Sequence, residues 1–295
     1  MAQTRVEVEV EGRRLSLSNL DKVMYPQVGF TKGEVIDYYT RVSPALLPHL
    51  RGRPLTLKRY PDGVEGEYFY EKNCPSHAPE WVRKERIGGI SYCICDDLPT
   101  LVWAANLADL ELHPSLSKAD DISRPTLMAF DLDPGEGAGL AECCEVAVIL
   151  REALAQLGLD CYAKTSGSKG IQVYVPLNSD DVDYRGGTKL ISNALARHLE
   201  TQQPKLIVAS QRKDLRAGKV LIDWSQNDEH KTTVCVYSLR ARERPTVSTP
   251  LAWEEIERGD PQKLVFEAGD VLERVEEHGD LFGRVAEQEQ RLPEL

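Results

Sequence analysis

LMAFDLDPG, at residues 127–135, joins a short apolar run to two aspartates and a Pro-Gly turn. An apolar run of this length that ends in turn residues is typical of a buried strand. Alternate side chains of a strand share a face, so Asp131 and Asp133 would lie about 6.5 Å apart at the Cα level on one side. Neighbouring carboxylates repel each other unless a cation lies between them, and hard divalent metals prefer such oxygen ligands. The stretch predicts a strand that carries a metal site.

The sequence SGSKG, at residues 166–170, follows a predicted helix over residues 140–158 and a predicted strand over residues 162–165, and precedes a strand over residues 171–176. Its backbone N–H groups and its lysine are what a polyphosphate requires. Taken alone, this motif also fits a plain turn, and Asp-x-Asp also fits a solvated strand end. Because one helix joins the two strand ends, we favour a single site for metal and phosphate.

A third aspartate occurs in the apolar stretch VLIDW, at residues 220–224. A buried lone carboxylate is costly unless it is paired or bound to a cation. Asp223 is therefore the expected third member of the Asp131 and Asp133 set.

Composition limits the class of protein. The chain has 295 residues, of which 41% are hydrophobic and 28% charged, enough for one large domain or two intimately packed ones. It has neither a run of 18 apolar residues nor a signal peptide, so we expect a soluble, cytoplasmic protein with no membrane partner. Seven cysteines, an odd number, argue against a disulfide framework and favour reduced thiols.

The net charge of −11 argues against a nucleic-acid partner, but the charge is unevenly distributed. Residues 251–295 contain 13 acidic and 5 basic residues, whereas residues 204–245 contain 9 basic and 5 acidic ones. The acidic tail, predicted as peripheral helices, therefore conceals a basic middle region.

The N-terminal part has clear local signals. Residues 5–15 alternate apolar and charged side chains around Gly12, which predicts a β-hairpin. Thr31 and Glu34 have the spacing of a capping box, so a helix should begin there. Lys22 and Lys32 flank this helix start, where an anion would gain from backbone N–H groups and two cations, although both also fit solvated surface lysines.

Other stretches allow more than one interpretation. Tyr68, Phe69 and Tyr70 are consecutive, so at least one ring should leave the core and could stack on a base. Cys74, His77, Cys93 and Cys95 could form a zinc site, although buried free cysteines are the default expectation. Residues 98–112 predict a buried helix that ends before His113, and residues 231–239 predict a strand.

DLDPG, SGSKG and the stretch LRAGKVLIDWSQN (215–227) resemble the polymerase domain of bacterial ATP-dependent DNA ligase D, in the archaeo-eukaryotic primase superfamily. The resemblance covers nearly the whole chain, from NLDKVMYP (19–26) through RPLTLKRYPDG and DLPTLVWAANLA to SLRAR (238–242). It implies an α+β fold with an RNA-recognition-like catalytic sheet, a second β-rich subdomain and peripheral helices. We expect one primase-polymerase domain with a DNA-end-binding part over residues 1–120, a catalytic core over 121–250 and an acidic helical part over 251–295.

The resemblance also implies roles for particular residues. Asp131, Asp133 and Asp223 would bind two ions, Mn²⁺ or Mg²⁺. Ser166 and Lys169 would contact the triphosphate of the incoming nucleotide, helped by Lys219 and Arg240, with His113 near its sugar. Asn19, Lys22 and Lys32 would hold a recessed 5′-phosphate, and Phe69, beside Tyr70, would stack on the template.

One position departs from the family. Two residues after the SGxxG turn the family usually carries a histidine that contacts the triphosphate, and this chain has Gln172. Glutamine can donate a hydrogen bond but carries no charge, so capture of the triphosphate is expected to be weaker.

The implied activity is template-dependent nucleotidyl transfer at gaps or broken double-stranded DNA ends, with a preference for ribonucleotides, in non-homologous end joining. Ku and an ATP-dependent DNA ligase are the expected partners, and the protein would associate with the nucleoid during repair. The ligase motif Lys-x-Asp-Gly is absent, so we expect a stand-alone relative or an excised domain.

A DNA-end-binding module with weakened catalysis is the alternative. A phosphatase that uses Asp131 as nucleophile is disfavoured, because Gly135 stands where such enzymes carry Thr or Val, two residues after the second aspartate.

Overall fold

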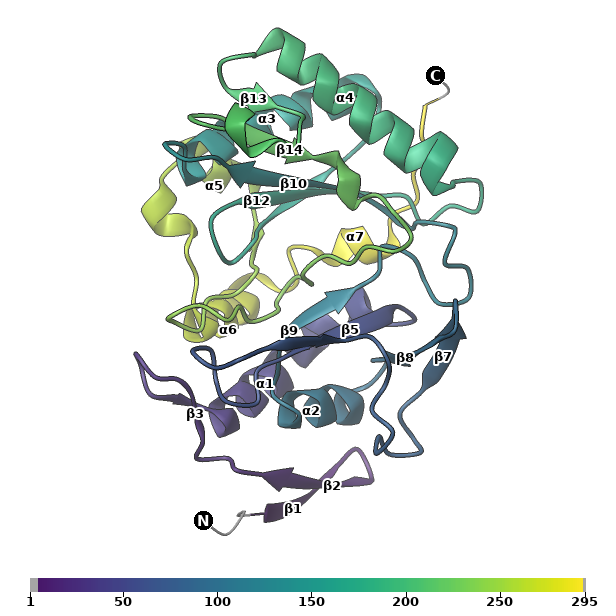
Figure 1. The fold of residues 1–295 in the computed structure, drawn as a ribbon, viewed down its shortest axis with the longest axis vertical. Coiled ribbons are helices and arrows are strands. Elements are labelled where there is room, and N and C mark those ends of the chain that lie inside the picture. The colour runs from purple at the N-terminus through teal and green to yellow at the C-terminus, as the bar shows by residue number, and fades with distance from the viewer. Residues whose placement is uncertain (1–4, 294–295) are drawn as a thin grey trace. The chain divides into compact units, whose positions relative to one another are not determined.

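The computed structural model describes residues 5–293, which form two compact units (Figure 1). Unit 1 contains the described residues up to Pro114, together with Val234–Val247 and Phe266–Asp280. Unit 2 contains Ser115–Thr233, Ser248–Val265 and the described residues from Leu281 onward. The acidic C-terminal part therefore contributes to both units.

Unit 1 is built on a five-stranded sheet in which β5 pairs with three neighbours. The predicted hairpin is present and turns at Glu11 and Gly12, both with positive φ. The elements of the unit are β1 (Arg5–Val10), β2 (Arg13–Ser18), β3 (Val23–Tyr25), β4 (Phe30–Thr31), α1 (Lys32–Leu50), β5 (Pro54–Arg59), β6 (Phe69–Glu71), β7 (Lys84–Ile87), β8 (Ile90–Ile94), α2 (Leu98–Asn106), β9 (Asp109–Pro114) and α6 (Ala268–His278).

Helix α1 begins at the predicted capping box. The Thr31 hydroxyl accepts a bond from the Glu34 N–H, and the Glu34 carboxylate accepts one from the Thr31 N–H. Tyr38 and Tyr39 on the inner face are fully buried, and their hydroxyls donate to the carbonyls of Tyr237 and Leu110. A tyrosine can be buried whole when its hydroxyl has such a partner.

The helix predicted over residues 98–112 is wrong in its second half. Helix α2 ends at Asn106, and Ala108 adopts a positive φ of 61°, which breaks the helical path. The chain then enters β9, where Asp109, Glu111 and His113 alternate with leucines. A run of buried apolar residues ahead of this alternation concealed the change of period.

The strand predicted over residues 231–239 is also wrong. Only isolated bridges at Thr232 and Leu239 occur there, and Tyr237 has a positive φ of 64°. The apolar side chains are buried as expected, but the backbone is irregular.

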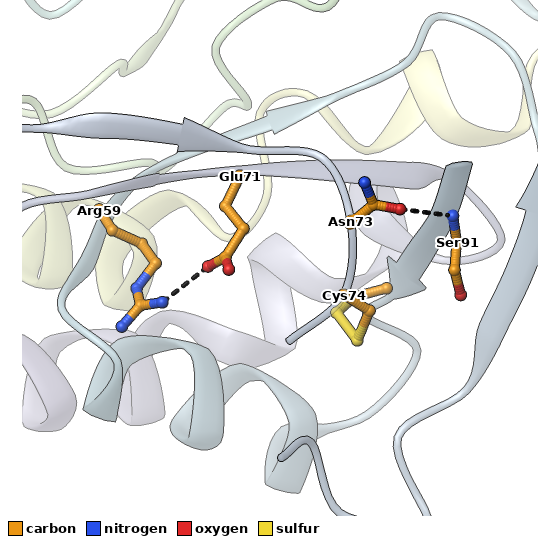
Figure 2. The surroundings of a disulfide bond; sticks show 6 residues. Arg59, Glu71, Asn73, Cys74 and Ser91 are labelled. Atoms are coloured by element: carbon orange, nitrogen blue, oxygen red, sulfur yellow. Dashed lines mark hydrogen bonds and ion pairs between the residues drawn. A yellow bond between two sulfur atoms is a disulfide. The ribbon is translucent and has the colours of Figure 1, made fainter. Parts of the chain in front are cut away.

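The prediction that all cysteines are reduced is corrected by a disulfide between Cys74 and Cys93 (Figure 2). The Cys74 N–H donates to the carbonyl of Ser91, which draws residue 74 against β8 and leaves the two Cα atoms 5.0 Å apart. That separation is within the range for a disulfide. The bond takes two of the four ligands of the alternative zinc site, and the remaining Cys95 is buried. An odd number of cysteines does not exclude one pair.

Unit 2 contains a six-stranded sheet of order β13-β14-β10-β12-β11-β15, and Figure 1 shows α3 and α4 on one side of it. Strand β10 lies between β14 and β12, antiparallel to both. The elements of the unit are β10 (Leu127–Pro134), α3 (Leu140–Gln156), β11 (Tyr162–Thr165), β12 (Ile171–Pro176), α4 (Lys189–Gln202), β13 (Ile207–Val208), β14 (Val220–Asp223), β15 (Pro250–Leu251), α5 (Trp253–Arg258) and α7 (Gly283–Glu287).

A π-helical turn over Tyr184–Thr188 precedes α4 and continues directly into it. Asp183 caps this turn by accepting a bond from the N–H of Gly186. Among the described residues, no helix combines the length and apolar character needed to cross a bilayer.

Two glycines allow loops to approach the end of β10 backbone to backbone. A Cβ atom on Gly170 would lie 2.1 Å from the carbonyl oxygen of Leu132, and one on Gly135 would lie 1.9 Å from that of Arg216. The Gly135 N–H also donates to the carbonyl of Lys219. The SGSKG loop and the basic loop before β14 are therefore fixed against the aspartate-bearing strand.

The Gly170→Ala substitution should lower the free energy of unfolding by about 1–3 kcal/mol, because the added methyl group forces the SGSKG loop away from β10. Gly269→Ala is the matched control, since a Cβ there would meet nothing within 4 Å. Because Gly269 lies in the first turn of α6, this control should be neutral or stabilising by up to about 1 kcal/mol. Urea unfolding of both variants is the measurement, and equal stability of the two would contradict the close packing of the loop.

Candidate active site

The three predicted aspartates lie together on one face of the unit 2 sheet. Asp131 and Asp133 are two residues apart on β10, and Asp131 is the cross-strand partner of Asp223 on β14. Directly opposed residues of antiparallel strands point to the same face. Phe130 and Leu132, which point the other way, are fully buried.

The carboxyl group of Asp131 is held in an unusual electrostatic environment. Burial and the neighbouring Asp133 raise its pKa to about 7, although a hydrogen bond from Gln172 and the charge of Lys164 act in the opposite direction. Its Oδ1 atom is buried and has no hydrogen-bond partner among residues 5–293. An unpartnered carboxylate oxygen beside a second carboxylate is a natural ligand for a hard cation.

Asp223 is buried, and hydrogen bonds engage both of its oxygens. Oδ1 accepts from the N–H and hydroxyl of Ser225 at 2.8 and 2.6 Å, and Oδ2 accepts from Gln226 at 3.0 Å. In this arrangement, residues 5–293 include no group of three or more His, Cys, Asp or Glu side chains that could hold a metal ion. The donor types suit a divalent cation, and among the described residues Oδ2 of Asp223 accepts only the one bond from Gln226, which leaves it acceptor capacity for a cation.

Gln172 lies between Asp131 and a buried lysine. In the register of the sheet, Asp131 faces Gln172 and Gln172 faces Lys164. Lys164 is fully buried, and its ammonium donates to the Gln172 side-chain oxygen and, at 2.7 Å, to the hydroxyl of Ser248. An ammonium has only donors, so the amide oxygen of Gln172 must face it, which leaves the NH₂ group for Asp131.

Asn227 clamps β10 near the site and was not predicted. Its side-chain amide accepts from the N–H of Ala129 at 2.9 Å and donates to the carbonyl of Ala129 at 2.7 Å. Asp131 is two residues further along the strand. In the sequence, the asparagine at the end of the stretch VLIDWSQN gives no sign of this contact beyond its position after a buried strand.

The predicted phosphate-binding residues of unit 2 lie on the two loops that the glycines fix to β10. The Ser166 hydroxyl accepts bonds from the N–H groups of Ser168 and Gly170 at 3.2 and 3.1 Å, which shapes the SGSKG loop. A hydroxyl can donate its own hydrogen at the same time. Lys169 is exposed on this loop, and Lys219 is half-buried beside the turn at Gly135.

His113 and Arg240 lie in unit 1, where both contact the buried carboxylate of Glu111. His113 Nε2 lies 3.0 Å and Arg240 Nε 3.4 Å from Glu111 Oε2. Lys58 completes this group at 3.1 Å. Neither Glu111 nor Lys58 was predicted as a site residue, although the alternation of β9 would have placed Glu111 and His113 on one face.

Phe69 and Tyr70 are both exposed on β6, as a stacking surface requires, with exposed fractions of 43% and 56%. The guanidinium of Arg59 lies 5.1 Å from the centre of the Phe69 ring and is paired with Glu71 (Figure 2). This contact supports the ring from one side and adds positive charge beside it.

Asn19, Lys22 and Lys32 are brought together at the start of α1. The Lys32 N–H donates to the carbonyl of Lys22, and Asn19 adopts a positive φ of 54° in the turn that leads there. Lys32 is buried and donates to the carbonyl of Ser18 at 2.7 Å, while Lys22 pairs with Asp62. Burial, with the charges of Lys22 and Arg59, lowers the pKa of Lys32 to about 8.

The expected help from backbone N–H groups at this helix start is not available. The N–H groups of Lys32, Gly33 and Glu34 are bonded to Lys22, Leu20 and Thr31. An anion would be held here by side chains.

Comparison with known proteins gives a consistent result. Residues 31–282 match the family model described as the LigD primase-polymerase domain. The chain is 44% identical over 260 residues to the multifunctional non-homologous end joining protein LigD of Mycolicibacterium smegmatis, which covers 86% of this chain and 34% of that protein. It is 34% identical over 244 residues to the bifunctional LigD of Bacillus subtilis, covering 83% of this chain and 40% of that protein. The chain therefore spans 34% to 40% of the length of these curated relatives.

A solved structure, the polymerase domain of Mycobacterium tuberculosis Ligase D in complex with DNA, matches with a TM-score of 0.88 and 38% identity. The match covers 94% of this chain and 99% of that chain. The predicted fold and enzyme class are thereby confirmed. The chain belongs to the LigD primase-polymerase domain family.

Proposed function

We propose that this chain adds nucleotides, with ribonucleotides preferred, to a DNA 3′ end at gaps or broken ends that carry a 5′-phosphate. Ku and an ATP-dependent DNA ligase would act with it in non-homologous end joining. The observation that carries the proposal is the set of three aspartates on one face of the unit 2 sheet. One oxygen of Asp131 is buried there, with no hydrogen-bond partner in the described part of the chain.

Asp131, Asp133 and Asp223 would hold two divalent cations, Mn²⁺ or Mg²⁺. When bound, such cations activate the 3′-hydroxyl and neutralise the charge that develops on the transferred phosphoryl group. The chain itself orients the reactants: Gln172 and Asn227 fix the position of Asp131 and of its strand. No side chain has to act as a nucleophile in such a transfer.

Ser166 and Lys169 would contact the triphosphate of the incoming nucleotide, helped by Lys219 and Arg240, with His113 near its sugar. Phe69, with Tyr70, would stack on the template base, since an exposed ring supported by Arg59 accepts any base on its face. The alternative of a catalytically weakened end-binding module is separated from this proposal by the first experiment below.

Asp131→Asn should reduce primer extension on a one-nucleotide gap by more than about a hundredfold, because loss of even an outer partner of a metal ligand costs about 10–100-fold. Binding of the gapped DNA should persist or tighten slightly, since a negative charge is removed. Asp180→Asn is the control, because this aspartate is exposed and forms an ion pair with Arg124 away from the three aspartates. Substantial extension by Asp131→Asn would refute the metal assignment, and no extension by the wild type would favour the end-binding module.

The double substitution Lys22→Ala/Lys32→Met should weaken binding of a gap with a 5′-phosphate roughly tenfold or more, since each charge-assisted contact is worth about 1.5–3 kcal/mol. Binding of the same gap with a 5′-hydroxyl should change little. Lys84→Ala/Arg86→Ala removes two exposed cations of β7 in the same unit and should affect both DNAs weakly. If the Lys22/Lys32 variant lost affinity equally for both DNAs, these lysines would be part of a general basic surface and not of a 5′-phosphate site.

Recognition of the 5′-phosphate should also depend on pH. Lys32 has a pKa of about 8, so its charge is present below that pH and lost above it. A bound phosphate favours the charged form and moves this loss to higher pH. The affinity ratio between phosphorylated and hydroxyl gaps should fall as the pH rises from about 7 to about 10, where even an unperturbed lysine begins to lose its proton. In Lys32→Met the ratio should be smaller and nearly flat across that range, and an equally steep fall would exclude Lys32 as its source.

A further inference from the structure

Glu111 is a buried carboxylate in unit 1 that lies beneath three cationic side chains. Its own side chain is 2% exposed, whereas those of Lys58, His113 and Arg240 are 12%, 12% and 14% exposed. All three have a nitrogen within 3.4 Å of Glu111 Oε2. The three cationic side chains are partly exposed, whereas the carboxylate that they contact is buried.

The other oxygen of Glu111 is held by the fold. Oε1 accepts from the N–H of Ala241 at 3.0 Å and from the hydroxyl of Tyr60 at 3.4 Å. The segment that carries Arg240 is thereby tied to β9. Both oxygens of the carboxylate are engaged, so its orientation is fixed.

The balance of charges in this cluster is positive. Burial alone would raise the pKa of Glu111, but its bonds and charge contacts with His113, Arg240 and Lys58 lower it overall, so it stays ionised. Burial lowers the pKa of Lys58 and of His113, and Glu111 opposes both effects. The nearby Asp109 is fully buried, and burial raises its pKa well above the usual value, which favours its neutral form. One carboxylate therefore neutralises only part of the positive charge of its three neighbours, and the remaining charge can attract an anion.

Aromatic rings lie close to Lys58 and His113. Lys58 Nζ lies 5.3, 4.7 and 5.5 Å from the ring centres of Tyr60, Tyr68 and Tyr70. The ring of His113 lies edge-on to Tyr70 at 5.9 Å. Rings at these distances attract the ammonium of Lys58 and limit the orientations that its side chain can adopt.

We propose that Glu111 is the positioning residue that holds Lys58, His113 and Arg240 as one preformed group for the phosphates and sugar of the incoming nucleotide. The proposal rests on the nucleotidyl transfer proposed above and adds two residues to it, Glu111 and Lys58. Preformed donors and charges bind an anion without the cost of ordering flexible side chains. Glu111 does not touch the nucleotide and acts through its three neighbours.

The charged and titratable groups that face this cluster come from several elements. Lys58 and Tyr60 lie on or next to β5, Tyr68 and Tyr70 on or next to β6, and Asp109 and His113 on β9. Further groups that act electrostatically on members of the cluster are Tyr25, Tyr39, Arg59, Glu71, Arg240 and Arg242.

Glu111→Gln is the principal test, because it keeps the shape and removes the charge. The KM for the nucleoside triphosphate in primer extension should rise about tenfold, as for loss of a charge-assisted contact, with a smaller change in kcat. Without Glu111 the pKa values of Lys58 and His113 fall further, so the KM ratio of variant to wild type should grow as the pH rises from about 6 to about 9. Glu85→Gln, which breaks a half-exposed pair with Arg83, is the matched control and should keep the wild-type KM at every pH.

A merely structural role gives a different result. Glu111→Gln would then lower the melting temperature and the active fraction, while the KM and its pH dependence stayed as in the wild type, and that outcome overturns the proposal. Absence of extension or of nucleotide binding in the wild type would instead refute the proposed function.

Glu111→Asp provides a second test of the positioning role of Glu111 if the glutamine variant does not fold. It retains the charge but withdraws the carboxylate by about one C–C bond length, roughly 1.5 Å. The KM should rise several-fold while the pH profile keeps its wild-type shape, because the charge that supports Lys58 and His113 remains. An unchanged KM in Glu111→Asp would also overturn the proposal.

Discussion

The placement of a carboxylate on the central strand of a sheet is the constraint on which this structure depends. Asp131 lies between Asp223 on one neighbouring strand and Gln172 on the other, and the register leaves no choice of partner. Burial and repulsion raise its pKa to about 7, so the ionised form is costly without a cation. The glycines at residues 135 and 170, the clamp by Asn227, the SGSKG loop and the basic loop before β14 all fix the backbone around this one side chain.

Much of unit 2 could be predicted from local patterns, because the strands carrying the aspartates are short apolar runs with turn residues at both ends. The alternation along β10 placed Asp131 and Asp133 on one face, and the cost of a lone buried carboxylate pointed to Asp223. Which strand would pair with which could not be obtained in this way. The register that sets Asp223 opposite Asp131 depends on contacts far apart in sequence.

Unit 1 was harder to predict, for reasons that particular residues show. The apolar run of α2 passes into β9 with only a short break near Ala108, so a helix was predicted through Glu111 and its role was missed. The disulfide depends on the approach of residue 74 to β8, which no spacing of cysteines reveals. The capping box at Thr31 was predicted correctly, yet it occupies the N–H groups that were expected to bind an anion. In each case a tertiary contact decided between local possibilities of similar strength.

Gln172 can now be understood from its neighbours in this chain. The family histidine would bring a charge toward phosphate, but here the residue touches the fully buried ammonium of Lys164. A protonated imidazole beside that ammonium would place two like charges in a site of low polarity, whereas a neutral amide accepts from Lys164 and donates to Asp131. The glutamine is therefore matched to Lys164, and its uncharged side chain supports the carboxylate of Asp131. The phosphates would then be left to the cations of the loops and to the group held by Glu111.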